Sequence, residues 1–126
     1  MGKFLIKKTE MGIVFHLRAA NGETIGVSQV YESEEACKKG IESVMKVAPT
    51  AGVEDQTRSR SKELKNPKFE IYKDKGEKFR FRLKAHNGQE VLASQGYTAK
   101  ASCKNGIQSI IANAPSSPII EPDKTK

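Results

Sequence analysis

Most of this chain of 126 residues repeats itself, and the internal duplication constrains the fold more than any other feature. The segment 79–85 matches the segment 13–19, and the pair Asn-Gly follows each of them after one further residue. The segment 103–115 matches the segment 37–49 even at its Cys, Gly and Ser positions. Self-similarity on this scale indicates two copies of one structural unit. The fold of one repeat therefore predicts most of the fold of the chain.

The clearest strand in the sequence runs from Lys78 to Ala85. Apolar and basic residues alternate along it, which is the pattern of a strand with one buried face and one open face. The apolar set is Phe79, Phe81, Leu83 and Ala85, and the basic set is Lys78, Arg80, Arg82 and Lys84. The pair Asn87-Gly88 tolerates the positive φ angles of a type I′ turn, so we expect a hairpin there. The matching segments before and after this strand predict a three-stranded meander in each repeat.

A helix follows the strands of each repeat. Ser33 is a suitable N-cap for the first helix, and Pro49 ends it. Apolar residues recur between these two at helical spacing, namely Cys37, Ile41, Val44 and Ala48. Gly40 and its match Gly106 lie inside the helices, where Gly costs about 1 kcal/mol relative to Ala. We expect each glycine to mark a close approach of another part of the chain.

Two copies of this unit can share one core, whereas a single helix covers only part of a three-stranded sheet. We therefore expect an α+β domain with both helices on one face of a joined antiparallel sheet, related by a pseudo-two-fold axis. Residues 57–66 lack an apolar period and are rich in Ser, Arg and Lys, which predicts a flexible basic linker. The predicted parts are the first repeat at 1–56, the linker at 57–66, the second repeat at 67–122 and the tail at 123–126.

The second repeat resembles the YegP-like family of small bacterial proteins. The resemblance is carried by Lys68-Phe69-Glu70-Ile71-Tyr72-Lys73-Asp74, Phe79 to Ala85 with Asn87-Gly88, Gly96-Tyr97, Lys100-Ala101 and Asn105-Gly106-Ile107. The first repeat departs from this pattern at Lys7, Val14, His16 and Val30.

The resemblance implies tandem β-β-β-α-β repeats, or one such unit per chain in a homodimer, with a single sheet and exchanged last strands. The fourth strands would then lie near Gly52 to Asp55 and Pro118 to Glu121, each pairing in the other repeat. The family is of unknown function, so the resemblance implies no catalytic or ligand-binding residue.

The chain is basic, with 22 Lys and Arg against 15 Asp and Glu and a formal net charge of +7. This excess favours contact with polyanions or anionic surfaces. Two cysteines do not form a disulfide framework, and the sequence shows no secretory signal and no membrane-spanning run, so we expect a soluble cytoplasmic protein. The two His and two Cys lack close ligand spacing, so we expect no metal and no cofactor.

The basic open face of the sheet is the best candidate for a functional site. The central strand and its neighbours contribute Arg80, Arg82, Lys84, Tyr72, Lys68, Arg18, Lys3, Lys7 and His16. Such cations contact phosphates and a Tyr ring stacks on bases, which predicts an anion or nucleic-acid site whose main residues are Arg80, Arg82, Lys84, Tyr72, Lys68 and Arg18. The alternative is an ordinary solvated face, because a sheet covered by helices on one side presents polar residues on the other.

No motif in the sequence selects an enzymatic reaction, since there is no Gly-rich phosphate loop and no nucleophile elbow. We interpret the chain as a non-enzymatic binding or interaction module, a monomer that contains an internal pseudo-dimer. Two alternatives stay open. The first is nucleic-acid or polyanion binding on the basic face, and the second is an enzyme with its site in the groove between the repeats.

Overall fold

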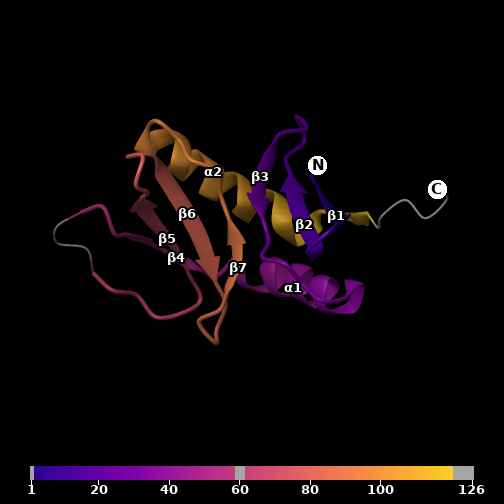
Figure 1. Ribbon diagram of the computed structural model, residues 1–126. Helices are drawn as coiled ribbons and strands as arrows, with labels where there is room; N and C mark the ends of the chain where they lie inside the picture. The colour runs from indigo at the N-terminus through magenta and orange to yellow at the C-terminus, as the bar shows by residue number, and fades with distance from the viewer. Residues whose placement is uncertain (1, 59–61, 121–126) are drawn as a thin grey trace.

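The computed structural model describes residues 2–58 and 62–120, and its elements follow the order that the duplication predicts (Figure 1). The first repeat contains β1 (Lys3–Thr9), β2 (Gly12–Arg18), β3 (Thr24–Val27), α1 (Glu34–Val47) and β4 (Gly52–Asp55). The second repeat contains β5 (Lys68–Lys73), β6 (Phe79–Lys84), β7 (Glu90–Ala93), α2 (Lys100–Asn113), a 3₁₀ turn (Ala114–Ser116) and β8 (Ile119–Ile120). Within the described ranges, no helix has the length and apolar character needed to cross a membrane.

The strands form one eight-stranded sheet in the order β4-β5-β6-β7-β3-β2-β1-β8. The two repeats meet at its centre, where β3 runs antiparallel to β7 and Val27 pairs with Ala93. The order of strands outward from this pair is the same on both sides, so the pseudo-two-fold axis passes between Val27 and Ala93. The tandem-repeat α+β fold with two helices is therefore confirmed.

The outermost strands correct the prediction of a purely antiparallel sheet, because both run parallel to their neighbours. β4 follows α1 and pairs with β5, whereas β8 follows α2 and pairs with β1. A parallel pair cannot be joined by a tight turn and needs a connection of about a dozen residues or more. The segment between Asp55 and Lys68 supplies such a connection. Residues 59–61 of the predicted linker, Glu121 of the predicted last strand and the tail 123–126 lie outside the described residues.

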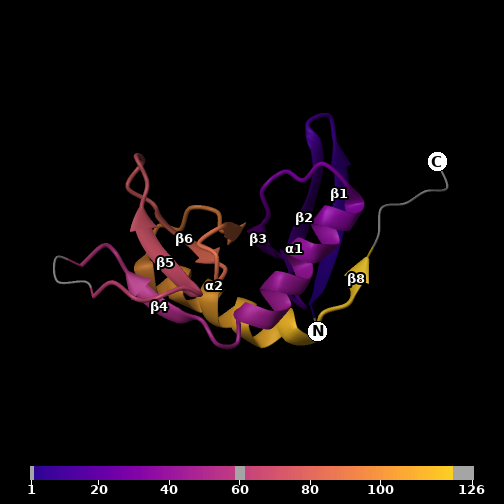
Figure 2. The same ribbon diagram turned by 90° about the horizontal axis from the view of Figure 1, so that it is seen from below.

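The core lies between the sheet and the two helices, and each repeat builds its part in the same way. Phe4 and Phe15 meet edge to face with ring centroids 5.8 Å apart, and Phe69 and Phe81 repeat this contact at 6.0 Å. Figure 2 shows α1 lying across β1 and β2, and α2 running from β6 toward the first repeat, where it also contacts β3. The Ser33 side chain accepts a hydrogen bond from the backbone of Ala36 at the start of α1, which confirms the predicted N-cap.

The two helix glycines mark close contacts, as predicted, and the approaching group is a tyrosine of the same repeat. A Cβ atom at Gly40 would lie 2.2 Å from Tyr31 Oη, and one at Gly106 would lie 2.8 Å from Tyr97 Oη. Each tyrosine is held by backbone hydrogen bonds, since Tyr31 pairs with Ile13 and Tyr97 pairs with Phe79. The duplicated Gly positions therefore seat a duplicated Tyr ring on each helix.

The Asn-Gly hairpins differ from the predicted type I′ turn. Gly88 has a φ of +85°, but Asn87 is not among the residues with positive φ. Gly88 N–H donates to Ala85 O, and Ala85 N–H donates to Gln89 O, so the loop contains three residues. A three-residue hairpin loop combines a type I turn with one left-handed residue, which explains why only the glycine has a positive φ. The Asn87 side chain accepts a hydrogen bond from Gln89 N–H and stabilises the loop.

Candidate anion-binding face of the sheet

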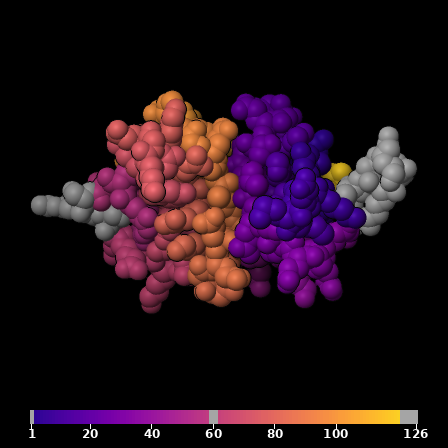
Figure 3. Space-filling model, in the orientation of Figure 1, coloured from indigo at the N-terminus to yellow at the C-terminus, as the bar shows by residue number. Residues whose placement is uncertain are grey.

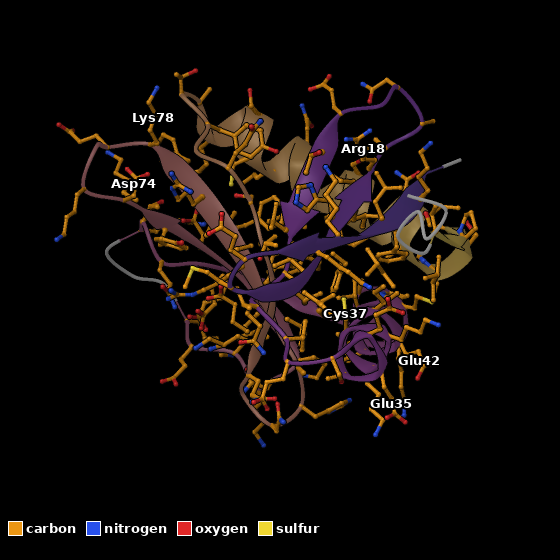
Figure 4. All side chains as sticks on the ribbon, turned by 45° about the vertical axis from the view of Figure 1, so that its right-hand side comes forward. Arg18, Glu35, Cys37, Glu42, Asp74 and Lys78 are labelled. Carbon is orange, nitrogen blue, oxygen red and sulfur yellow. The ribbon has the colours of Figure 1, made fainter. Side chains whose placement is uncertain are left out.

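We call the side of the sheet opposite the helices the open face. The core residues Phe4, Phe15, Phe69 and Phe81 point toward the helices, so their chain neighbours point to the open face. The first repeat contributes Lys3, Leu5, Lys7, Val14, His16, Arg18 and Val27. The second repeat contributes Glu54, Lys68, Glu70, Tyr72, Arg80, Arg82, Lys84 and Ala93. Figure 4 shows Arg18 and Cys37 on opposite sides of the first repeat's strands.

Glu70 lies at the centre of the charges on the second repeat's open face. Arg82 Nε donates to Glu70 Oε1 at 2.6 Å, and the Nζ atoms of Lys68 and Lys84 lie 3.2 and 3.6 Å from its carboxylate. Glu70 is only 3 % exposed because these long side chains cover it. Burial alone would raise the pKa of Glu70, but the hydrogen bonds from Arg82 and Lys68 bring the pKa below its ordinary value.

Glu54 on the edge strand β4 extends this cluster. Lys68 Nζ donates to Glu54 Oε1 at 2.8 Å, and the same oxygen accepts from Leu64 N–H at 2.7 Å. Gln56 donates to the other oxygen. The bond from Lys68 is the main reason that the pKa of Glu54 falls to about 2, and Glu54 in turn raises the pKa of Lys68. Leu64, in the predicted linker, is thereby attached to β4.

Arg80 and Tyr72, two further residues of the predicted basic site, also have partners. Arg80 Nε donates to Asp74 Oδ2, and Asp74 Oδ1 accepts from two backbone N–H groups of the β5–β6 turn. The bond from Arg80 is the main reason that the pKa of Asp74 lies below its ordinary value, and the two backbone N–H groups lower it further. Arg82 stacks over the ring of Tyr72, with its guanidinium carbon 4.5 Å from the ring centroid. We call Glu54, Lys68, Glu70, Asp74, Arg80, Arg82 and Lys84 the paired network.

The structure therefore brings together five of the six residues predicted from the sequence, and places Arg18 on the other repeat. The four cations among the five each have a carboxylate partner, and Tyr72 lies beneath Arg82. The pairing of these cations with Glu70, Glu54 and Asp74 was not predicted from the sequence. Their signal was present in the sequence, because Glu54 lies on the proposed fourth strand and Asp74 precedes the β5–β6 turn.

The matching region of the first repeat has no such carboxylates among its described residues. Lys3 pairs with Arg18 across β1 and β2, Leu5 pairs with His16, and Lys7 pairs with Val14. Among the residues that the structure describes, Lys3, Lys7 and Arg18 make no ion pair. We call Lys3, Leu5, Lys7, Val14, His16, Arg18 and Val27 the first-repeat face.

Two polar atoms of the first-repeat face are buried without a hydrogen-bond partner in the described part of the chain. They are Nδ1 of His16 and Nε of Arg18. Burial lowers the pKa of His16, and the positive charges of Lys7 and Arg18 lower it further. His16 is therefore neutral at pH 7, beside cations that no carboxylate of the described residues balances.

The cysteines and histidines do not form a site in the described residues. Cys37 and Cys103 are free thiols, fully buried on the helix side of the sheet. Burial raises the pKa of each thiol to about 11, so neither is a reactive thiolate at neutral pH. No group of three or more His, Cys, Asp or Glu side chains in the described ranges could hold a metal ion.

Comparison with known proteins places the duplicated unit in a family. The family described as a domain of unknown function, DUF1508, matches this chain twice, at residues 12–55 and 74–121. A UPF0339 protein of Pseudomonas aeruginosa is 38 % identical over 109 residues, which cover 86 % of each chain. A UPF0339 protein of Treponema denticola is 54 % identical over 54 residues, which cover 43 % of this chain but 93 % of that protein. The Treponema protein therefore has the length of a single repeat.

A solved structure shows the same arrangement of two repeats. The solution NMR structure of YegP from E. coli, a protein of unknown function, is similar to this chain with a TM-score of 0.79 and 32 % identity. The similarity covers 99 % of this chain and 96 % of YegP. Both repeats, their order and their packing thus agree with those of a YegP-like protein. The chain belongs to the DUF1508 family of proteins of unknown function, in its two-repeat form.

Proposed function

We propose that this protein is a non-catalytic binding module and that its first-repeat face binds an anionic macromolecule. The observation that carries the proposal is the contrast between the two repeats. In the second repeat the open-face cations are neutralised by Glu54, Glu70 and Asp74. In the first repeat, within the described residues, Lys3, Lys7 and Arg18 have no such partners.

An anionic group on the first-repeat face would supply the negative charge that the described residues of this face lack. Lys3 and Arg18 lie opposite each other, so a carboxylate or phosphate between them would accept hydrogen bonds from both. A charged ligand on the second repeat would first have to compete with the bonds from Arg82 and Arg80 to their own carboxylates. Removing one partner from such a bond leaves the other charge unsatisfied, which is costly in a buried cluster. We therefore favour the first repeat over the second.

The enzyme alternative receives less support. A hollow of about 560 Å³ lies between α1 and the β6–β7 turn, so its lining comes from both repeats. Its lining includes Ser43, Tyr31 and His86, but no hydrogen bond in the described part of the chain connects His86 to either hydroxyl. A nucleophile held by a base is what such a site would need.

The free cysteines suit the reducing cytoplasm, where we place the module.

Fluorescence anisotropy with two labelled probes in low salt tests the proposal. The probes are an oligoglutamate and a single-stranded oligodeoxynucleotide of equal charge. The test variant is Lys3→Ser with Lys7→Ser, and the control is Lys75→Ser with Lys104→Ser, which removes two other exposed lysines and leaves the same net charge.

We expect at least one probe to bind, and the test variant to weaken that binding about tenfold, or by about 1.4 kcal/mol. The control variant should change it by less than about twofold. Equal losses in both variants would show that only the net charge matters, and absence of binding to both probes would refute the proposed function.

A further inference from the structure

We propose that the anionic partner of the first-repeat face is an extended, acidic segment of another protein, with an aliphatic side chain between two carboxylates. This inference rests on the proposed function, and it specifies the chemical class of the ligand. The argument uses the apolar residues of the face, the spacing of its cations and the charges that surround it.

An aliphatic row crosses the middle of the first-repeat face. Leu5 lies between His16 and Ile120, and Val27 lies on the far side of His16. Ile120 is 43 % exposed, and Leu5 and Val27 are half-buried. A partner that carries an aliphatic group would remove this surface from water, at about 25 cal/mol per Å² of apolar area.

The aliphatic character of this row disfavours a nucleic acid as the partner. Proteins that bind single strands without sequence preference stack bases on aromatic side chains. The aromatic ring among the open-face residues is Tyr72, which lies in the other repeat and is covered by Arg82. A nucleic acid on the first-repeat face would find cations for its phosphates, but among the described residues of the face the only ring for its bases is the small, half-buried imidazole of His16.

The spacing of the cations fits an extended peptide. Lys3, Leu5 and Lys7 alternate along β1 on the open face. A strand rises about 3.3 Å per residue, so the two lysines lie about 13 Å apart with Leu5 midway. A peptide in the same extended conformation repeats its side chains at the same interval, so residues i, i+2 and i+4 can present an acid, an aliphatic group and an acid.

The second repeat limits where such a segment can lie. Beyond Val27 the open face reaches a groove of about 400 Å³ at the junction of the repeats, lined also by Ala93 and Glu90. Figure 3 shows the two repeats as adjoining halves of the surface, with this junction between them. Past the junction Arg82 and Lys68 are already held by Glu70 and Glu54, so this half attracts an acidic segment less strongly. The segment would therefore stay on β1 and β2.

The test uses the full chain and three fluorescein-labelled probes in fluorescence anisotropy. The first is a peptide that contains Glu-Ser-Leu-Ser-Glu, and the second contains the same residues as Leu-Ser-Ser-Glu-Glu. The third is a single-stranded oligodeoxynucleotide with the same charge as the peptides. We expect the first peptide to bind at least tenfold more tightly than either of the others.

Two variants test the role of the aliphatic row. Leu5→Ser should bring the affinity for the first peptide down to that for the second, whereas Val53→Ser, at an exposed valine on β4, should leave it unchanged. Thermal unfolding by circular dichroism checks that both variants fold, and Val27→Ser replaces Leu5→Ser if that variant does not.

Each other outcome overturns the inference in a distinguishable way. Equal binding of the two peptides would refute the spacing argument. Tighter binding of the oligonucleotide would refute a protein partner but leave the anionic face in place. If no probe binds, the proposed function fails together with the inference.

Discussion

Glu70 occupies in the second repeat the position that Leu5 occupies in the first. Glu70 pairs across its hairpin with Arg82, and Leu5 pairs across its hairpin with His16. The same place in the duplicated sheet is therefore the centre of a charged cluster in one repeat and part of an aliphatic row in the other. This difference divides the open face into a half whose cations are paired with carboxylates and a half whose cations have no ion-pair partner among the described residues.

Replacing Glu70 tests how much the paired network stabilises the fold. Glu70→Gln keeps the shape of the side chain but removes the charge that faces Arg82, Lys68 and Lys84. Breaking a buried ion pair from one side typically costs about 3 kcal/mol, because the remaining charges lose their partner. We expect a loss of that size in the free energy of unfolding, measured by urea denaturation.

Glu90→Gln is the matched control for this prediction. Glu90 is exposed at the start of β7 and takes part in none of the ion pairs found among the described residues. Its replacement should change the stability by less than about 0.5 kcal/mol. Equal effects of the two substitutions would show that the cluster around Glu70 is no more than a solvated surface.

The low pKa of Glu54 predicts how the stability depends on pH. Because the folded-state value of about 2 lies below the ordinary 4.5, the charged form of Glu54 stabilises the protein above pH 4.5. This contribution disappears as the pH falls from 4.5 toward 2. Urea denaturation at several pH values should show a shallower decline for Glu54→Gln than for the unmodified protein in this range. Parallel curves for the two proteins would contradict the low pKa of Glu54.

Gly40→Ala should destabilise the protein although Ala is the better helix former. The new methyl group would lie 2.2 Å from Tyr31 Oη, so the ring or the helix must move. We expect a loss of about 2 kcal/mol from this overpacking, which exceeds the gain of about 1 kcal/mol in helix propensity. Thermal unfolding measures this loss. Lys39→Ala, at the neighbouring exposed position of α1, should be nearly neutral in the same experiment. A stabilised Gly40→Ala variant would refute the tight Tyr contact.

Much of the fold could be predicted because the duplication tests every local pattern twice. The alternation of Phe79, Phe81 and Leu83 and the Ser33 cap both correspond to elements in the structure. The parallel edges could not be derived from alternation, since a period of two is the same for parallel and antiparallel strands. The prediction of a type I′ turn was wrong, because each hairpin loop contains three residues instead of the two that a type I′ turn connects.

The location of the unpaired cations was harder to predict than the cations themselves. Alternation placed Arg80 and Arg82 on the open face correctly, but their partners Asp74 and Glu70 depend on strand register and on the β5–β6 turn. Glu54 reaches Lys68 only because β4 pairs with β5. Charge balance on a sheet is a property of neighbouring strands, so a sequence reveals it only after the strand pairing is known.

His16 should couple anion binding to proton uptake. Lys7 and Arg18 lower its pKa in the free protein, together with burial. A bound anion favours the protonated ring, so the pKa rises on binding and the affinity increases as the pH falls from 8 to 5.5. Below the pKa of the free protein this gain reaches about tenfold for each unit by which the pKa rises on binding.

Isothermal titration calorimetry with an oligoglutamate across this pH range would measure the effect. His16→Gln should remove the pH dependence, whereas His86→Gln, at the exposed β6–β7 turn, should keep it. If the affinity of the unmodified protein does not change with pH, His16 has no part in binding.

The most direct test of the central claim is an NMR titration of the isotope-labelled protein with an unlabelled oligoglutamate in low salt. The account predicts that the largest amide shift changes occur on β1 and β2, around Lys3, Leu5, His16 and Arg18, and that they diminish as salt is added. Arg80 and Arg82 should shift little, because Asp74 and Glu70 already hold them. The largest changes on β5 and β6, or none anywhere, would contradict it.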